Sequence, residues 1–149
     1  MVYSMTGEFR HNIDSKGRLI VPSKLRDALG SKIYVTISVD KCLNIYSTEE
    51  FEKFTEKLEQ IDTSTERGRM IKRYFLANAT DCELDAQGRI IIPNNLKEYA
   101  GLSKEVVIVG SKEKAEIWDS AVYDSMYVEN GLTQEDINKE IEQLGLQLF

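Results

Sequence analysis

Two aspartate–arginine pairs have the residue types and the spacing that could do chemistry. Asp14 and Arg18 lie four positions apart in DSKGRLIVP, and Asp85 and Arg89 repeat that spacing in DAQGRIIIP. An arginine can pair with the aspartate and stiffen a turn, or it can bind phosphate oxygens or a guanine edge with two hydrogen bonds. An exposed ion pair adds little stability. The sequence leaves both roles open, and both can hold together if each aspartate orients its arginine.

Further basic residues surround the first of these turns and indicate an anionic partner. They lie on both sides of Arg18 along the chain. A two-stranded β element is one of the shapes that fits the major groove of DNA. We therefore expect DNA contacts from six residues: Arg10, Lys16, Arg18, Lys24, Arg26 and Arg89.

Little in the sequence supports catalysis. His11 is the only histidine, which leaves no histidine pair for a metal and no obvious Ser-His-Asp set. Cys42 and Cys82 lie outside any CxxC motif and are expected to be free thiols in a reducing cytoplasm. We expect no enzyme activity, cofactor, metal or small-molecule substrate. For His11 we favour a surface or partly buried position beside the first turn, with a phosphate contact as the alternative.

The charges are segregated along the chain. A net charge of −6 over 149 residues argues, taken alone, against a nucleic-acid partner. Residues 111–149 hold nine acidic and three basic residues, whereas positive charge gathers in 10–26 and 67–73. A protein with this distribution can bind an anion on one face and repel it from another.

The composition is that of an ordinary globular protein. Hydrophobic residues make up 42% of the chain and charged residues 30%. No apolar run approaches the roughly 20 residues that cross a bilayer. The first residues, MVYSMTGEFRHNID, lack the basic and apolar regions of a secretory signal. We expect a cytoplasmic protein without membrane contact.

The two turns belong to a larger internal repeat. Each copy is expected to contain a strand, the Asp-x-x-Gly turn, a second strand ended by proline, a short helix and two more strands. Ser23 or Asn94 is expected to cap the short helix, and Gly30 or Gly101 to end it. One fixed shift relates the copies: Asp14, Gly17, Arg18, Ile20, Pro22, Leu25 and Gly30 correspond to Asp85, Gly88, Arg89, Ile91, Pro93, Leu96 and Gly101.

Helices are expected to follow each copy. Residues 47–50 (STEE) and 63–66 (TSTE) have the spacing of capping boxes, so helices are expected to open at Ser47 and Thr63. The basic residues of the second helix are expected to form a solvated face rather than a DNA contact. Its apolar residues are expected in the core: Met70, Ile71, Tyr74 and Phe75. Thr133 is expected to open a last helix with one apolar stripe: Ile137, Ile141, Leu144 and Leu148.

A unit of four short strands and one helical turn buries too little apolar surface to fold well alone. Two copies in one chain can complete one core. We therefore expect an α+β, mainly β fold, with a pseudo-twofold, swapped-hairpin-like β-barrel and packed helices. The chain is expected to be a single domain, 1–149, of four parts: repeat 1 (6–48), connecting helices (49–76), repeat 2 (77–120) and C-terminal helices (121–149).

The doubled Asp-x-x-x-Arg motif resembles the MraZ family of bacterial transcriptional regulators, whose members contain two SpoVT-AbrB-like units. The resemblance includes DSKGRLIVPSKLR and YFLANATDCELDAQGRIIIP and covers nearly the whole chain. It implies the swapped-hairpin barrel, a ring-shaped homo-oligomer, and binding of double-stranded DNA at repeated promoter boxes. It also implies repression of the protein's own operon for cell division and wall synthesis, and association with the nucleoid.

By position, the resemblance places Arg18 and Arg89 on the DNA-binding surface, with Asp14 and Asp85 as their partners. An oligomer would align several such turns on one rim and gain affinity by multivalency. The acidic C-terminal helix is expected to pack away from that rim.

The resemblance also implies that the two repeats are unequal. Basic residues that contact DNA in single-unit relatives correspond to His11 and Arg26 in the first repeat, but to Cys82 and Lys97 in the second. The second repeat also has glutamine in place of Lys16. The first repeat is therefore expected to be the main electrostatic contact, so replacing its motif arginine is expected to weaken DNA binding more.

A second interpretation is an interaction module. Units of this kind also occur in antitoxins that bind a toxin through a C-terminal extension, which here would be residues 119–149. Such antitoxins usually have one unit, so the duplication argues against this interpretation. A neighbouring small toxin gene would favour it, and a neighbouring cell-division cluster would favour the regulator.

Overall fold

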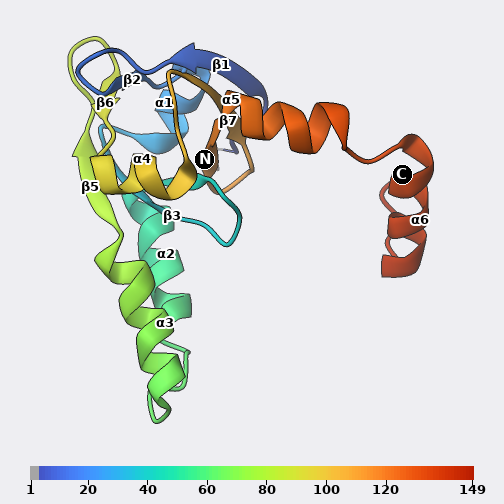
Figure 1. Ribbon diagram of the computed structural model, residues 1–149. Coiled ribbons are helices and arrows are strands. Elements are labelled where there is room, and N and C mark those ends of the chain that lie inside the picture. Colours follow the sequence, from blue (N-terminus) through green and yellow to red (C-terminus); the bar gives the residue numbers. More distant parts are fainter. Residues whose placement is uncertain (1–3) are drawn as a thin grey trace.

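The computed structural model describes residues 4–149 and shows an α+β fold, as expected (Figure 1). The first residues of the segment compared above with secretory signals, 1–3, lie outside the described part. Six strands form one antiparallel sheet in the order β1-β7-β8-β4-β3-β5. Their bounds are Glu8–Asn12 (β1), Lys32–Ile37 (β3), Leu43–Ser47 (β4), Thr80–Glu83 (β5), Glu105–Gly110 (β7) and Ala115–Asp119 (β8).

The two repeats exchange their first strands. β1, from the first repeat, pairs with β7 of the second, and β5 of the second repeat pairs with β3 of the first. β1 and β5 therefore stand at opposite edges of the sheet. This interleaving is what the swapped-hairpin prediction requires. The division into repeats and helices proposed from the sequence, with one domain over the whole chain, stays a prediction.

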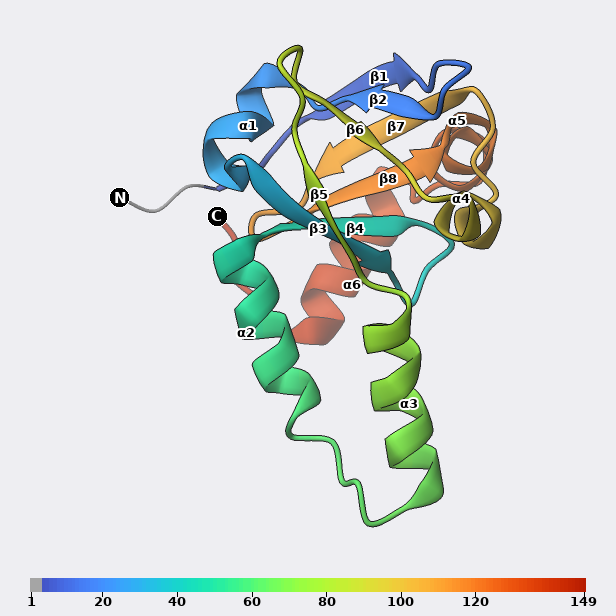
Figure 2. The ribbon, with the colours of Figure 1, turned by 90° about the vertical axis from the view of Figure 1, so that its left-hand side faces the viewer.

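A two-stranded ribbon joins the repeats a second time. β2 (Arg18–Ile20) and β6 (Arg89–Ile91) pair antiparallel, with Leu19 opposite Ile90. The hydrogen bonds continue beyond the strands, because Val21 N–H donates to Gly88 O at 2.9 Å and Ile92 N–H donates to Gly17 O at 3.1 Å. β2 packs beside β1 and β6 beside β5, so the ribbon spans the two edges of the sheet (Figure 2).

The core is built by both repeats. The inward side chains of the ribbon, Leu19 and Ile90, are 0% and 1% exposed. They belong to one cluster with apolar residues of the sheet and the short helices. Corresponding residues of the two repeats both belong to this cluster, for example Val21 and Ile92, Leu25 and Leu96, and Ile37 and Ile108.

The short helices begin directly after the prolines, and their predicted caps were wrong. α1 (Ser23–Leu29) and α4 (Asn94–Ala100) have proline in the N-cap position, without a side-chain cap hydrogen bond. The proline carbonyl instead accepts the first hydrogen bond, from Leu25 N–H in α1 and Leu96 N–H in α4. Proline suits this position because its φ is preset and its missing N–H is not needed there. The predicted C-terminal glycines are confirmed, with φ of 78° and 62°.

Two longer helices form a hairpin that extends away from the sheet (Figures 1 and 2). α2 (Thr48–Leu58) opens as predicted, because the side chain of Ser47 accepts the backbone N–H of Glu50 at 3.1 Å. α3 (Glu66–Ala77) opens two residues later than predicted. Its N-cap is Thr65, whose hydroxyl accepts Gly68 N–H at 3.1 Å. The later start follows from a turn before it, in which Asp62 accepts Ser64 N–H.

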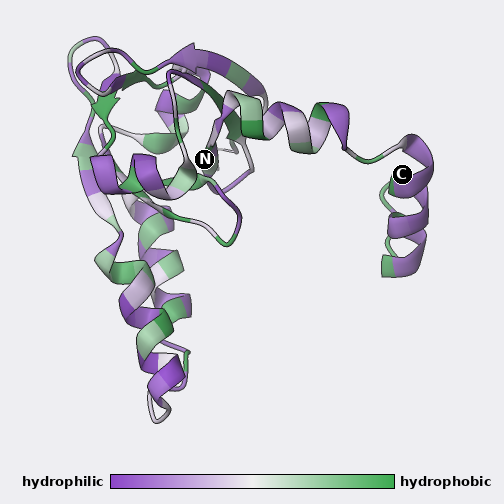
Figure 3. Cartoon of the chain, in the orientation of Figure 1, coloured by the Kyte–Doolittle hydropathy of each residue, from purple (hydrophilic) through white to green (hydrophobic). Residues whose placement is uncertain are grey.

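The prediction that the apolar residues of α3 are core residues was wrong for three of the four. Met70, Ile71 and Tyr74 are 56%, 48% and 49% exposed, and only Phe75 packs against the core. Figure 3 shows apolar positions among polar ones along this hairpin. The helical spacing identified an apolar face, but the face has no cover within residues 4–149.

The chain ends in helices that lead away from the sheet. α5 (Ser120–Tyr123) continues as the π-helix η1 (Asp124–Glu129), and α6 (Gln134–Leu144) follows. Thr133 opens α6 as predicted, through a capping box with Asp136. Figure 1 shows α6 on the other side of the molecule from the β1–β2 and β5–β6 turns, as expected for the acidic tail. Within residues 4–149, the helices are all too short or too polar to cross a membrane.

Candidate nucleic-acid interface

The first turn holds its arginine with the preceding aspartate. Asp14 Oδ1 accepts the backbone N–H groups of Lys16 and Arg18, each at 2.9 Å, and Oδ2 accepts Arg18 Nε at 2.6 Å. Gly17 lies in the turn with a φ of 79°, a backbone conformation that favours glycine. The hydrogen bond from the Arg18 backbone, with the other bonds from Arg18 and Lys16, holds the pKa of the Asp14 carboxyl below its usual range. The pair therefore persists above that range and is lost only as pH falls through the lowered pKa.

The second turn repeats this geometry. Asp85 Oδ1 accepts the backbone N–H groups of Gln87 and Arg89 at 2.9 and 2.8 Å, and Oδ2 accepts Arg89 Nε at 2.8 Å. Arg89 Nη2 also donates to Gln87 Oε1 at 3.1 Å. Both arginines are thus oriented through Nε, which leaves terminal nitrogens available to an anion. For Arg18 no partner of either terminal nitrogen is found among the described residues.

The short helices bring each repeat's cation to the other repeat's turn. Arg26, on α1, donates from Nε to Val21 O at 2.8 Å, and its guanidinium lies over Gly88 of the second turn. Lys97, on α4, brings Nζ to 3.9 Å from where a Cβ of Gly17 would stand. Each turn therefore has a cation from its own repeat and one from the other. We expected the first repeat to be the main electrostatic contact with DNA. This expectation is weakened, because Arg26 lies at the second turn.

The outer face of the ribbon combines the two arginines with two isoleucines. Arg18 stands directly opposite Ile91, and Ile20 directly opposite Arg89. Because side chains alternate along a strand, these four share the face opposite the buried Leu19 and Ile90. Ile20 is 41% exposed and Ile91 62%. The sequence interpretation missed both isoleucines, although their spacing of two from each arginine already placed them on its face.

Comparison with known proteins agrees with this geometry. The family model described as "MraZ protein, putative antitoxin-like" matches residues 5–74 and again 75–143.

The chain belongs to the MraZ family.

Curated relatives match over nearly their whole lengths. "Transcriptional regulator MraZ" of Lachnoclostridium phytofermentans is 45% identical over 140 residues, 94% of this chain and 96% of the relative. The protein of the same name from Desulforamulus reducens is 43% identical over 138 residues, 93% and 97% of the two chains. That from Acetivibrio thermocellus is 41% identical over 140 residues, 94% and 98%. These are names of regulators, so the expectation that the chain is not an enzyme is confirmed.

Arg10 is held by the C-terminal segment of this MraZ family chain. It donates to Asp124 of η1 at 2.7 and 3.1 Å and to Ser120 at 3.3 Å. Its hydrogen bond lowers the pKa of Asp124, and the same bond raises that of Arg10. The acidic C-terminal segment thus neutralises this cation, while its last helix stays away from the turns. A DNA contact from Arg10 would first have to break this pair.

The remaining predicted residues are placed as follows. Lys16 and Lys24 are exposed, on the first turn and on α1. His11 is partly buried on β1, as favoured from the sequence, and lines a shallow recess with Glu105 and Ser120. Cys82 is partly buried and has only a weak contact, from Sγ to Ile91 O at 3.7 Å.

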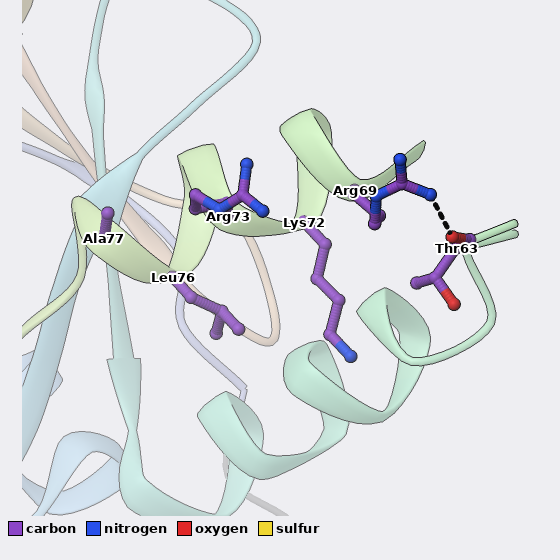
Figure 4. A pocket seen from close by; sticks show the side chains of 6 residues that line it. All are labelled: Thr63, Arg69, Lys72, Arg73, Leu76 and Ala77. Atoms are coloured by element: carbon purple, nitrogen blue, oxygen red, sulfur yellow. Dashed lines mark hydrogen bonds between the residues drawn. The ribbon is translucent and has the colours of Figure 1, made fainter. Parts of the chain in front are cut away.

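A basic groove lies on the helical hairpin, at the far end of the molecule from the turns (Figures 1 and 4). It encloses about 530 Å³. Lys72 pairs with Glu59 of the loop after α2 at 2.9 Å, and Arg69 donates to Thr63 O at 2.8 Å. Two of its cations are thus engaged within the chain. The lining residues are Thr63, Arg69, Lys72, Arg73, Leu76 and Ala77.

Proposed function

We propose that this protein binds double-stranded DNA through the two turns and regulates transcription. The observation that carries the proposal is the back-to-back joining of two Asp–Arg turns in one ribbon, which presents Arg18 and Arg89 on a single face. The names of the relatives support regulation of transcription. The DNA-binding residues of the proposal are the motif arginines with Lys16, Lys24, Arg26 and Lys97, whose Nζ lies near Gly17 of the first turn.

The ribbon suits the major groove. Two-stranded β-ribbons are among the elements that enter it, and a guanidinium can bind guanine or phosphate with two hydrogen bonds. Asp14 and Asp85 hold the arginines at Nε, so the side chains lose less freedom on binding DNA. The flanking cations are placed for the phosphates on either side. Stiffening the turn and contacting DNA are then two roles of the same aspartate–arginine pair.

The target and the regulation follow the family. We place the binding sites in repeated boxes upstream of the protein's own operon for cell division and wall synthesis, where binding represses that operon. This also places the protein in the cytoplasm, at the nucleoid. The support is the family membership and the doubled turn, which suits repeated sites.

A ring-shaped homo-oligomer completes the proposal. The exposed apolar face of α3 lies on a helix with four basic residues and one acidic, whereas α6 has four acidic residues and one basic, with Ile137 and Leu144 exposed. These two complementary surfaces lie at different ends of the molecule (Figure 1). Head-to-tail contact between such surfaces generates a ring if the rotation closes. The ring would set several turns side by side on repeated boxes, so that multivalency raises the affinity despite the net charge of −6 per chain.

The test of this function is a binding titration with the duplex upstream of the protein's own gene, at several salt concentrations. We expect log K to fall with log salt by about 0.9 for each phosphate contact. A shuffled duplex of equal length and composition is the control, and it should bind more weakly at every salt concentration. Equal affinity for the two duplexes would refute sequence-specific regulation.

Gly88→Ala and Gly17→Ala form a matched pair that tests the role of Arg26. Both glycines have positive φ, so each substitution should destabilise the fold by about 1–2 kcal/mol. Only at Gly88 would the new Cβ displace Arg26, since it would lie 2.6 Å from Nε, whereas nothing approaches within 3.9 Å at Gly17. If Arg26 contacts a phosphate, Gly88→Ala should lower the salt slope by about 1 beyond Gly17→Ala.

Arg26→Ala should reproduce that change of slope without straining the turn, which separates the cation from the glycine. Its own cost in stability is the lost hydrogen bond to Val21 O, about 1 kcal/mol. Identical salt slopes for Gly88→Ala and Gly17→Ala, together with an unchanged slope for Arg26→Ala, would remove Arg26 from the DNA-binding residues.

A second candidate function is an antitoxin-like or other protein-interaction module that uses the C-terminal helices. The observation that favours it is the apolar stripe of α6, in which Ile137 and Leu144 are exposed. Removal of residues 133–149 distinguishes the two functions. The regulator should then keep the DNA affinity of a single subunit and lose oligomer size, whereas an interaction module should lose its protein partner with no change in oligomer size.

A further inference from the structure

The outer face of the ribbon leaves two large apolar side chains in water. Ile20 and Ile91 are 41% and 62% exposed, while their strand neighbours Leu19 and Ile90 are buried. Single exposed apolar residues are common on protein surfaces. These two, however, occupy the same position in both repeats, each directly opposite a motif arginine. On this face, arginine and isoleucine therefore alternate both along each strand and across the strand pair.

Strand propensity alone does not explain the choice of isoleucine. Threonine is also β-branched and favoured in strands, and it would place a hydroxyl rather than a second apolar branch in the solvent. The six-stranded sheet lies behind the ribbon and takes its inward residues into the core. Nothing in residues 4–149 covers the outward isoleucines to the extent that the core covers Leu19. An apolar group beside two base-recognising arginines fits an apolar group on DNA.

The spacing along the strand suits neighbouring base pairs. Arg18 and Ile20 lie two residues apart on one strand, which corresponds to about 6.8 Å at about 3.4 Å per residue. Stacked base pairs rise by about 3.4 Å each. A strand lying along the groove therefore places the isoleucine about two base steps from the base that its arginine contacts. Arg89 and Ile91 repeat this spacing on the antiparallel strand.

Thymine alone among the four bases presents a methyl group in the major groove, and apolar side chains recognise it there. We infer that Ile20 and Ile91 contact the 5-methyl groups of thymines on either side of the ribbon's centre, so that the binding site is specified by thymines as well as by the bases that the arginines contact. This inference rests on the proposed DNA-binding function. It assigns the arginines to hydrogen bonding and the isoleucines to thymine.

The test replaces only the methyl groups. The probe is the duplex upstream of the protein's own gene, compared with the same duplex in which deoxyuridine replaces thymidine. Uracil keeps every hydrogen-bonding group of thymine and lacks the methyl. The wild-type protein should bind the uracil duplex about fourfold more weakly for each buried methyl group, or roughly 15-fold for two. Because this arm uses the unaltered chain, it does not depend on the folding of any variant.

The Ile20→Ala/Ile91→Ala variant completes a double-mutant cycle with the two duplexes. It should bind both with equal affinity, close to that of the wild type for the uracil duplex. Ile20→Thr/Ile91→Thr keeps β-branching and one methyl group, so it should lose only part of the discrimination, with a melting temperature and an oligomer size like those of the wild type.

Three outcomes would overturn the inference. The wild type could bind thymine and uracil duplexes equally, or the alanine variant could still discriminate between them. A smaller oligomer for the threonine variant would instead assign the isoleucines to a contact between subunits. Failure of the wild type to prefer its own upstream DNA over a shuffled duplex would overturn the proposed function itself, and the methyl comparison separates that result from these.

Discussion

Replacing both Arg18 and Arg89 by alanine is expected to weaken binding to the upstream DNA by more than a hundredfold. An arginine that binds a base edge with two hydrogen bonds contributes about 1–3 kcal/mol, and each 1.4 kcal/mol is a factor of ten. The two arginines share one face of one ribbon, so the double variant removes both contacts of every subunit. In an oligomer this loss is multiplied, because each site gains from its neighbours. A quantitative gel-shift or anisotropy titration measures it.

The single variants Arg18→Ala and Arg89→Ala should lose similar amounts. The sequence favoured a larger effect at Arg18, but Arg26 lies at the second turn and Lys97 near the first, which evens out the local charge. Arg18→Lys/Arg89→Lys is the control for charge, because lysine keeps the cation and loses the planar fork. It should keep binding to shuffled DNA and lose preference for the upstream sequence.

The alternative, in which each arginine only pairs with its aspartate and stiffens the turn, gives a different pattern for the same variants. If the arginines only stiffen the turns, the double alanine variant should melt earlier or change its oligomer size, and its DNA affinity should fall in proportion to the folded fraction. Unchanged melting and size, together with lost affinity, would establish the DNA contact.

Leu19→Ala is expected to have the largest effect on folding among ribbon substitutions. Leu19 is fully buried between the repeats and stands opposite Ile90. Truncating a buried leucine leaves a cavity and costs about 2–5 kcal/mol of unfolding free energy. Because the ribbon is one of the two places where the repeats are joined, the loss should appear as one cooperative transition at lower denaturant concentration. Chemical denaturation followed by circular dichroism measures it.

The neighbouring substitution Ile20→Ala is the matched control for stability. It lies on the same strand with its side chain outward, so its cost should be within about 0.5 kcal/mol. Equal destabilisation by Leu19→Ala and Ile20→Ala would mean that the outer face of the ribbon is also packed, and would contradict the division into an inner, folding face and an outer, binding face.

The local features of the fold were predictable because a few adjacent residues determine them. Each Asp-x-x-Gly turn is made by bonds within five residues, from Asp14 to Arg18 and from Asp85 to Arg89. The strands that follow α1 and α4 were also predictable, because they are β-rich runs that begin soon after a glycine. The swapped arrangement was predictable for a different reason, since half a domain of this size needs its copy to complete a core.

What the sequence could not predict depends on contacts between distant segments. The sequence placed Arg26 at the first turn, whereas it lies over Gly88 of the second. Only the pairing of β2 with β6 brings α1 to that turn, and the sequence does not show this pairing. Arg10 was placed among the DNA contacts, because its partner Asp124 lies far along the chain. Met70 was placed in the core, because helical spacing identifies an apolar face without saying whether the same chain covers it.

The start of α3 shows a further limit of local patterns. Thr63 and Thr65 are both good N-cap residues, and the capping-box spacing to Glu66 favoured the first. The structure uses Thr65, because Asp62 accepts the Ser64 N–H in a turn that delays the helix. Competing caps two residues apart are resolved by the loop before them, which the spacing alone does not describe.

Hydrogen–deuterium exchange of the full chain, with and without its upstream DNA, tests the central claim most directly because it maps the contacted face. Exchange should slow in residues 14–20 and 85–91, which form the two turns and the ribbon, and stay unchanged in α6. A shuffled duplex should produce less protection at the same sites. Protection confined to α3 or α6, with the two turns unchanged, would contradict the assignment of the ribbon as the DNA-binding surface.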